Sequence, residues 1–170
     1  MSSYDGWRYM RGAGLLKVIV LIPLALVVLL ALTFAFYEGR KAYWDYRVRE
    51  MCEKNGGVFI KDKIEISERE KQNLGTVAGY TSIPYKPLAD PDSPVYYVDH
   101  ESVIRESSPR VTMWEETIYR RSNKSVLANI VMFRRSGGDF PTYAYPSRFS
   151  CPDKLVILSK REEIFHEQGG

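Results

Sequence analysis

A run of twenty residues without a charged side chain, from Val18 to Tyr37, constrains this chain more than any other feature. At the rise of an α-helix such a run spans about 30 Å, the thickness of the hydrocarbon core of a bilayer. A soluble domain of this size does not need a uniformly apolar helix of that length. The sequence therefore predicts a transmembrane helix over residues 18–37.

The apolar run has the features of an uncleaved anchor rather than those of a signal peptide. A signal peptide has a shorter apolar region, of about 7–15 residues, followed by a cleavage site between small residues. The one passable cleavage triplet, Thr33-Phe34-Ala35, lies inside the apolar run. We expect three aromatic side chains to mark the two membrane interfaces, because amphipathic rings gather there: Trp7, Tyr37 and Trp44.

The charges around the run give conflicting indications of its orientation. The tail, residues 1–17, carries three basic residues and one acidic residue, which favours a cytoplasmic N-terminus. Five basic residues on the other side favour the opposite orientation by simple count: Arg40, Lys41, Arg47, Arg49 and Lys54. Long domains are translocated largely regardless of charge. We therefore predict a single-pass membrane protein with its tail in the cytoplasm and its domain on the other side of the membrane.

The part that follows the anchor is long enough for one compact domain and is nearly neutral. The chain has 24 basic and 21 acidic residues, and removing the tail's three and one leaves 21 and 20 for residues 38–170. Nucleic-acid binding requires clustered basic charge, which this balance does not indicate. The expected partners are therefore the lipid bilayer and another membrane or periplasmic protein, and not nucleic acid.

The two cysteines, Cys52 and Cys151, lie 99 residues apart. There is no CxxC motif, no third cysteine and no histidine at metal-ligand spacing, so the sequence predicts no metal site here. One interpretation is a disulfide between the first helix of the domain and its last segment. Closing a loop of that length stabilises a fold by about 4.7 kcal/mol in the chain-entropy model, and the bond requires an oxidising compartment. The other interpretation is two unrelated buried thiols.

Residues 38–57 are predicted to be a helix that ends at Asn55-Gly56-Gly57. Apolar residues recur on one side of it at helical spacing: Trp44, Val48, Met51 and Cys52. The helix either continues the anchor as a stalk that lifts the domain off the membrane, or lies on the bilayer surface. Three acidic side chains favour the stalk because they would be poorly placed near anionic lipid: Asp45, Glu50 and Glu53.

Residues 58–170 have the pattern of a small α+β domain. Alternating residues predict a strand over Val58–Ile66, and a capping box at Ser67–Glu70 predicts a short helix that runs to Leu74. A loop with four prolines covers residues 79–94. The runs Arg110–Arg121 and Ser125–Arg135 predict a central hairpin covered on both faces.

The remaining pattern completes an antiparallel sheet of four or five strands. A strand is expected to begin at Val95, and a short one is expected over Leu155–Leu158. Arg161–Gln168 is predicted to form a last helical turn or two. The predicted fold is thus a transmembrane helix, a stalk helix and a small antiparallel sheet with a long proline-bearing loop.

The candidate catalytic residues are Glu116, Asp99 and His100. Asp99-His100-Glu101-Ser102 contains triad-type residues, but triads are assembled from separated segments, so a solvated loop or strand end is the expected structure. A half-buried Glu116 with a raised pKa would be a functional candidate, although such residues more often pair across the sheet with an arginine. No metal-ligand set, phosphate loop or nucleophile motif is present, so no cofactor is expected.

Loop tyrosines are a further feature of the sequence. Such side chains either contact a partner protein, since tyrosine is enriched in interface cores, or pack the loop onto its own domain. Four of them lie in expected loops: Tyr80, Tyr85, Tyr143 and Tyr145.

The stretch from Tyr43-Trp44-Asp45 through Cys52-Glu53-Lys54-Asn55-Gly56-Gly57-Val58, together with Cys151-Pro152, resembles a group of uncharacterised small bacterial membrane proteins. About twenty residues and the late dipeptide carry the resemblance. It implies a bacterial source and favours pairing of the two cysteines, and it brings no activity with it.

Two functions are consistent with these observations. The first is a non-enzymatic, membrane-tethered interaction or accessory protein that faces the periplasm. The second is a small membrane-anchored enzyme or ligand-binding domain whose site combines scattered residues such as Glu116, Asp99 and Arg120. A deep pocket that holds a carboxylate with a raised pKa favours the second function, and an exposed aromatic patch on a shallow surface favours the first.

Overall fold

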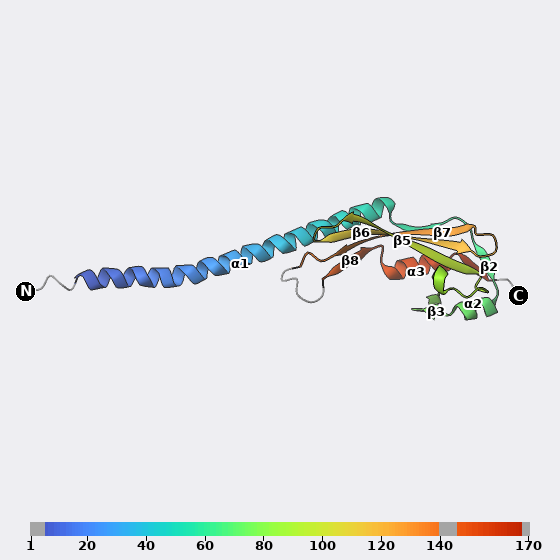
Figure 1. Cartoon of the computed structure of the whole chain (residues 1–170), viewed down its shortest axis with the longest axis horizontal. Coiled ribbons are helices and arrows are strands. Elements are labelled where there is room, and N and C mark those ends of the chain that lie inside the picture. The colour runs from blue at the N-terminus through green and yellow to red at the C-terminus, as the bar shows by residue number, and fades with distance from the viewer. Residues whose placement is uncertain (1–5, 140–145, 168–170) are drawn as a thin grey trace, which may run out of the picture.

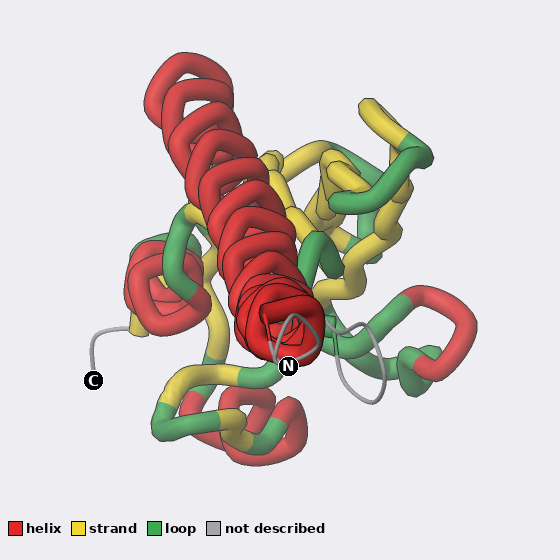
Figure 2. Tube along the Cα trace, turned by 90° about the vertical axis from the view of Figure 1, so that its left-hand side faces the viewer, coloured by secondary structure: helices red, strands yellow, loops and turns green. Residues whose placement is uncertain are grey.

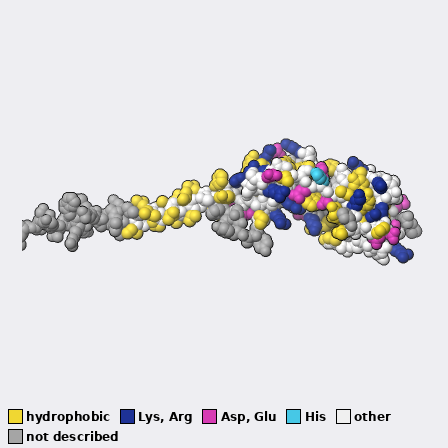
Figure 3. Space-filling view, viewed as in Figure 1, with side chains coloured by type: hydrophobic (Ala, Val, Ile, Leu, Met, Phe, Trp, Pro, Cys, Tyr) yellow, Lys and Arg dark blue, Asp and Glu magenta, His cyan; other side chains and the backbone are white. Residues whose placement is uncertain are grey.

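The computed structural model of the chain describes residues 6–139 and 146–167, and the side chains from residue 19 onward except those of Pro87 and Glu167. It begins with one uninterrupted helix, α1 (Gly6–Asn55). By its length and composition, the stretch Ile19–Asn55 could cross a membrane. A signal sequence near the N-terminus meets the same criteria. The apolar side chains of this stretch are exposed, and they form the rod that leads into the charged head in Figure 3.

Helix α1 ends at Asn55, where the sequence predicts it to end. The amide of Gly56 donates a hydrogen bond of 2.7 Å to the carbonyl of Cys52, and a Cβ atom at Gly56 would lie only 2.8 Å from that oxygen. Gly57 follows with φ of +137°, a conformation that favours glycine. The two glycines thus allow the chain to leave the helix and enter the sheet directly.

The domain is built on a five-stranded antiparallel sheet with the order β1–β7–β6–β5 and with β8 also beside β7. Strands β1 and β8 pair with different halves of β7, so β5 forms the opposite edge. The outer edge of β5 forms one isolated bridge, between Tyr97 and Tyr85. In the described part of the chain, no strand pairs with this edge. The bounds are β1 (Gly57–Ile60), β5 (Val95–Arg105), β6 (Arg110–Arg120), β7 (Val126–Ser136) and β8 (Arg148–Cys151).

Smaller elements surround this sheet. Strand β2 (Ile64–Ile66) pairs in parallel with β9 (Phe165–Glu167), and β3 (Thr76–Val77) pairs with β4 (Tyr80–Thr81). The helices are α2 (Glu68–Leu74), the short 3₁₀ helix η1 (Lys86–Leu88) and α3 (Lys154–Glu162).

The sheet lies between α1 and α3, and each face carries its own apolar cluster (Figure 1). On the α1 face the buried residues are Val48, Cys52, Val111 and Phe133. On the α3 face they include Ile118, Ile130, Ile157 and Ile164, each at most 4% exposed. Complete burial of such a side chain contributes about 1.5–3 kcal/mol. The prediction of a sheet with apolar residues on both faces of its central hairpin is confirmed.

The part of α1 after Tyr37 continues the apolar helix as predicted, but the domain does not stand at the far end of α1. Strands β7 and β8 pack along it, so that Val48 is fully buried against the sheet. The turn between β5 and β6 accepts a hydrogen bond from Arg40 at the carbonyl of Ser108. In the view from the N-terminal end, α1 projects toward the reader in front of the domain (Figure 2). The domain therefore packs along α1 beginning just after the apolar run.

The capping box, the hairpin and the α+β class are as predicted, but three local assignments were wrong. The run Val58–Ile66 is two strands in different sheets, because Asp62 between them binds Arg120 at 2.8 Å and the chain turns there. Residues 155–158 belong to a helix, α3, since the side chain of Asp153 accepts a hydrogen bond from the amide of Leu155 and begins it. The segment predicted as last helical turns contains β9, which pairs with β2.

Candidate functional site

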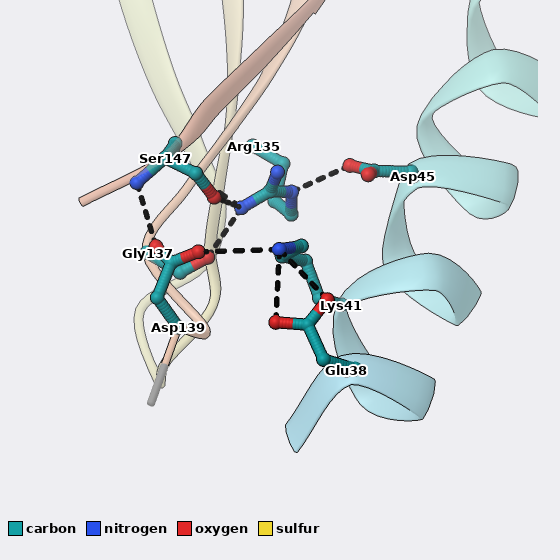
Figure 4. Close-up of polar contacts among 7 residues, drawn as sticks. All are labelled: Glu38, Lys41, Asp45, Arg135, Gly137, Asp139 and Ser147. Atoms are coloured by element: carbon teal, nitrogen blue, oxygen red, sulfur yellow. Dashed lines mark hydrogen bonds and ion pairs between the residues drawn. The ribbon is translucent and has the colours of Figure 1, made fainter. Parts of the chain in front are cut away.

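A network of charged side chains connects α1 to the sheet at the end of the apolar run (Figure 4). Asp45 accepts a bond of 2.5 Å from the Nε atom of Arg135 on β7, whose side chain is only 3% exposed. Arg135 also donates to the carbonyl of Gly137 and to the hydroxyl of Ser147 at 2.9 Å. The guanidinium thereby joins the helix to both ends of the segment that links β7 to β8.

One turn closer to the apolar run, Lys41 lies between two carboxylates. Its Nζ atom is 2.9 Å from Glu38 and 3.4 Å from Asp139, and Asp139 in turn accepts a bond of 2.6 Å from the amide of Ser147. The hydrogen bond to Glu38 raises the pKa of Lys41, with a smaller contribution from Asp139. Burial opposes ionisation of Asp139, but bonds from Ser147 and Lys41 outweigh it and lower its pKa. Both shifts favour the charged forms of Lys41 and Asp139.

A third connection joins α1 to β8. The Sγ atoms of Cys52 and Cys151 lie at a bonding distance of 2.12 Å, with Cα atoms 5.9 Å apart, so the two predicted partners form the disulfide. Among the described residues there is no free cysteine. The bond closes the cluster on the α1 face, where both cysteines pack beside Phe133.

The predicted interface aromatics have different positions. Tyr37 is half-buried at the end of the apolar run, with Phe36 edge-on at 5.7 Å. The ring of Trp44 packs against the cluster on the α1 face, and the guanidinium of Arg105 lies 4.6 Å from the centre of that ring. The side chain of Trp7 lies outside the described residues.

The structure describes two of the four loop tyrosines, Tyr80 and Tyr85. Tyr85 packs against Tyr97 at 5.3 Å, which matches packing of the loop onto its own domain. Tyr80 is half-buried in β4, and Tyr143 and Tyr145 lie outside the described residues. Two tyrosines that the sequence analysis did not single out as contact residues are exposed on α1 just beyond the apolar run: Tyr43 and Tyr46, at 56% and 64%.

On the opposite face of the sheet, a pocket of about 290 Å³ lies between β6, β7, β8 and α3. It is lined by four charged side chains and an apolar wall. The charged residues are Glu116, Arg134, Lys154 and Arg161, and the other lining residues are Trp114, Met132, Ser150, Pro152, Ile157 and Leu158.

Glu116 is the most buried of the charged groups in this pocket, at 8% exposed. Burial raises its pKa, the nearby guanidinium of Arg161 opposes this, and Asp99 adds to the rise. Arg161 Nη1 lies 3.3 Å from Glu116 Oε1, within ion-pair distance but without hydrogen-bond geometry. Arg161 Nε is likewise buried with no hydrogen-bond partner in the described structure. Glu116 and Arg161 therefore each have one buried polar atom without a hydrogen-bond partner in the described structure.

The structure brings together only some of the residues singled out from the sequence. Asp99 on β5 is the direct cross-strand neighbour of Glu116 on the same face. His100 points to the other face, opposite Glu115, and is exposed, so it does not join them. Arg120 binds Asp62 and the carbonyl of Lys63 at 2.8 Å, outside the pocket.

The arginine beside Glu116 comes from α3, not from across the sheet, and the sequence analysis missed it. Its segment was interpreted as a short strand followed by helical turns. Two local signals could have identified the helix: Asp153 at a capping position after Pro152, and the helical spacing of Ile157, Leu158 and Arg161. Arg134 and Lys154 carried no distinguishing signal in the sequence.

A second cavity, of about 380 Å³, lies between α2 and the loop before β5. Its lining is acidic, with Glu70, Asp90 and Asp92 among its residues. Glu70 serves the capping box, where bonds from Ser67 lower its pKa. Within the described ranges no group of three or more His, Cys, Asp or Glu side chains is placed to hold a metal ion.

Comparison with known proteins finds no match: no protein family, no curated protein and no solved structure is significantly similar to this chain.

Proposed function

We propose that this chain is a membrane-anchored, non-enzymatic interaction or accessory protein, which holds its domain at the membrane surface for a second membrane or periplasmic protein. The observation that carries this proposal is the direct connection of the anchor helix to the domain at Lys41, Asp45 and Cys52. The first connection follows Tyr37 by four residues on a continuous helix. The domain thus has a fixed height and orientation relative to the anchor. A docking partner in the same membrane needs that geometry, whereas an enzyme acting on a dissolved substrate works equally well on a flexible tether.

The proposed location is a bacterial inner membrane, crossed once, with residues 1–17 in the cytoplasm and the domain in the periplasm. The paired cysteines support this side because disulfides persist in oxidising compartments. The five basic residues after the anchor count against it. The test is labelling of intact cells with a membrane-impermeant maleimide, in a chain without native cysteines. Lys61→Cys, in the exposed segment after β1, should be labelled and Ser2→Cys should not; the reverse result would place the domain in the cytoplasm.

A flexible insertion tests the interaction function itself. A glycine-serine linker of about eight residues between Tyr37 and Glu38 leaves the three connections intact but frees the domain from the orientation of the anchor. Chemical crosslinking in native membranes should then lose the complex that the unmodified chain forms. The control is the same linker inserted at Ser122–Lys124, the distant turn between β6 and β7. A complex that persists with the juxtamembrane linker, or no complex with the unmodified chain, would contradict the proposal.

A second candidate function is a membrane-anchored ligand-binding domain. The specific observation in its favour is the pocket on the α3 face, in which Glu116 is buried with a raised pKa beside Arg161. Buried ionisable groups in a pocket with an apolar wall are typical of ligand sites. Ligand binding in this pocket should survive the juxtamembrane linker, which distinguishes this function from the first.

A further inference from the structure

The pocket on the α3 face carries more positive charge than its own carboxylate compensates. Three basic side chains line it, and Glu116 is the one acidic residue among the described lining residues. Glu116 is paired with Arg161. Arg134 and Lys154 form no ion pair within the described part of the chain; Arg134 lies 5.7 Å above the ring of Trp114. The nearby carboxylate of Asp153 caps α3 and does not line the pocket. Two positive charges at the pocket therefore remain without a counter-ion.

The other wall of the pocket is apolar. Trp114 and Met132 are cross-strand neighbours on the same face of the sheet, and Ile157 and Leu158 of α3 lie across from them. A volume of about 290 Å³ is near the lower end of the range for small-molecule sites. The combination suits a ligand with an anionic head and an apolar body. Arg161 lines the pocket between these two walls and is paired with Glu116.

The position of the pocket favours a dissolved ligand over a lipid headgroup. Its residues lie beside Arg135 and Cys151, which contact α1 at Asp45 and Cys52, eight and fifteen residues beyond Tyr37. At the rise of an α-helix, Asp45 and Cys52 lie about 12 and 22 Å along α1 from the end of the apolar run. The pocket lies between the sheet and α3, and α3 covers the face of the sheet opposite α1 (Figure 1). A headgroup at the membrane surface does not reach that position.

We propose that this pocket binds a small soluble organic anion, a carboxylate with an apolar body, with Arg134 and Lys154 at the anionic head and Trp114 and Met132 against the body. The inference rests on the second proposed function, ligand binding, and is independent of the interaction function. It assigns a chemical class to the ligand.

The test compares benzoate with its neutral analogue benzamide, using the full chain in nonionic detergent. Binding is followed by calorimetry and by the NMR signal of the indole N–H of Trp114. Benzoate should shift that signal and bind at least about tenfold more tightly than benzamide. Arg134→Gln combined with Lys154→Gln should weaken benzoate binding by about tenfold or more, since charge-assisted contacts are lost. The matched control, Lys61→Gln combined with Lys63→Gln, removes the same charge outside the pocket and should leave the affinity unchanged.

Each contrary outcome has a distinct meaning. Equal binding of benzoate and benzamide at Trp114, or a double variant that binds benzoate as tightly as the native chain, would overturn the anionic class while ligand binding stands. No response of Trp114 to either compound would overturn both. A response to nanodiscs of phosphatidylglycerol but not of phosphatidylcholine would identify a lipid headgroup instead of a dissolved anion. Thermal unfolding of the double variant at the native temperature excludes misfolding as the cause.

Discussion

Asp99 on β5 and Glu116 on β6 lie directly opposite each other on one face of the sheet, so two carboxylates occupy neighbouring positions. Glu116 is the buried member, and Arg161 is its one ion-pair partner in the described structure. Burial raises the pKa of Glu116 although Arg161 opposes it, and the charge of Asp99 adds to the rise. Burial also raises the pKa of Tyr97, and the charges of Glu116 and Asp99 add to that rise. The sheet thus retains a carboxylate that is destabilised in its ionised form.

This arrangement predicts how stability depends on pH. Between the ordinary carboxyl pKa of 4.5 and the higher folded value, the folded chain binds more protons at Glu116 than the unfolded chain does. The contribution of Glu116 to stability is therefore present below this window and is lost as the pH rises through it. Glu116→Gln should remove that loss, and Glu115→Gln, at the exposed neighbour, should not. Urea unfolding of the full chain in detergent across this pH range measures both. Parallel pH profiles for the native chain and Glu116→Gln would contradict the assignment.

The buried guanidinium of Arg135 is predicted to be a major contact between helix and sheet. Arg135→Met should lower the free energy of unfolding by about 3 kcal/mol, because Asp45 is left beside the sheet without its partner. Arg47→Met removes a solvent-exposed partner of Glu50 on the same helix and should cost less than about 1 kcal/mol. Chemical denaturation of the two variants side by side provides the comparison. Equal effects of the two substitutions would be inconsistent with a buried pair.

Reduction of the disulfide is expected to have a larger effect. Cys52 and Cys151 close a loop of 99 residues, for which the chain-entropy model gives about 4.7 kcal/mol. Unfolding of the native chain should therefore shift to lower denaturant on addition of dithiothreitol. The variant with Cys52→Ser and Cys151→Ser should match the reduced chain and be insensitive to the reagent. A native chain whose midpoint is unaffected by reduction would show that the bond is absent.

Loss of the cap of α2 should have a local effect. Ser67 accepts a bond from the amide of Glu70, and the carboxylate of Glu70 accepts one from the amide of Ser67, while no side chain of α2 is fully buried. Ser67→Ala should destabilise the helix by about 1 kcal/mol. We expect faster amide hydrogen exchange within residues 68–74 and little change in β6 and β7. Faster exchange throughout the sheet would mean that α2 is part of the cooperative core.

Elements whose determinants are local could be predicted from the sequence almost to the residue. The capping box at Ser67 and the terminator at Gly75 enclose α2 and fix both of its ends. The hairpin β6–β7 depends on two alternating runs and the short link between them. The end of α1 depends on Gly56 and Gly57, which follow it directly.

Elements that depend on distant partners could not be predicted. Strand β9 exists because Phe165–Glu167 pairs with β2 at the start of the domain, and no local pattern indicates that. The β-branched residues of Leu155–Leu158 suggested a strand, but the cap at Asp153 and burial of Ile157 and Leu158 favour a helix. The same distinction between local and distant determinants applies to the residues of the candidate site. Alternation along β6 identified Glu116, whereas Arg161 and Arg134 come to it from other elements through the fold.

The strands of the sheet run along the same long axis as α1 (Figure 1). This direction matters for the outer edge of β5, which has no strand partner in the described part of the chain. An open edge is a site for self-association. Antiparallel pairing of β5 with β5 of a second copy requires a twofold axis perpendicular to the sheet, and that rotation reverses the direction of the anchor. Two copies inserted in one bilayer in the same direction cannot meet that requirement. Insertion into a membrane would thereby prevent the antiparallel edge-to-edge dimer that β5 permits in the free domain.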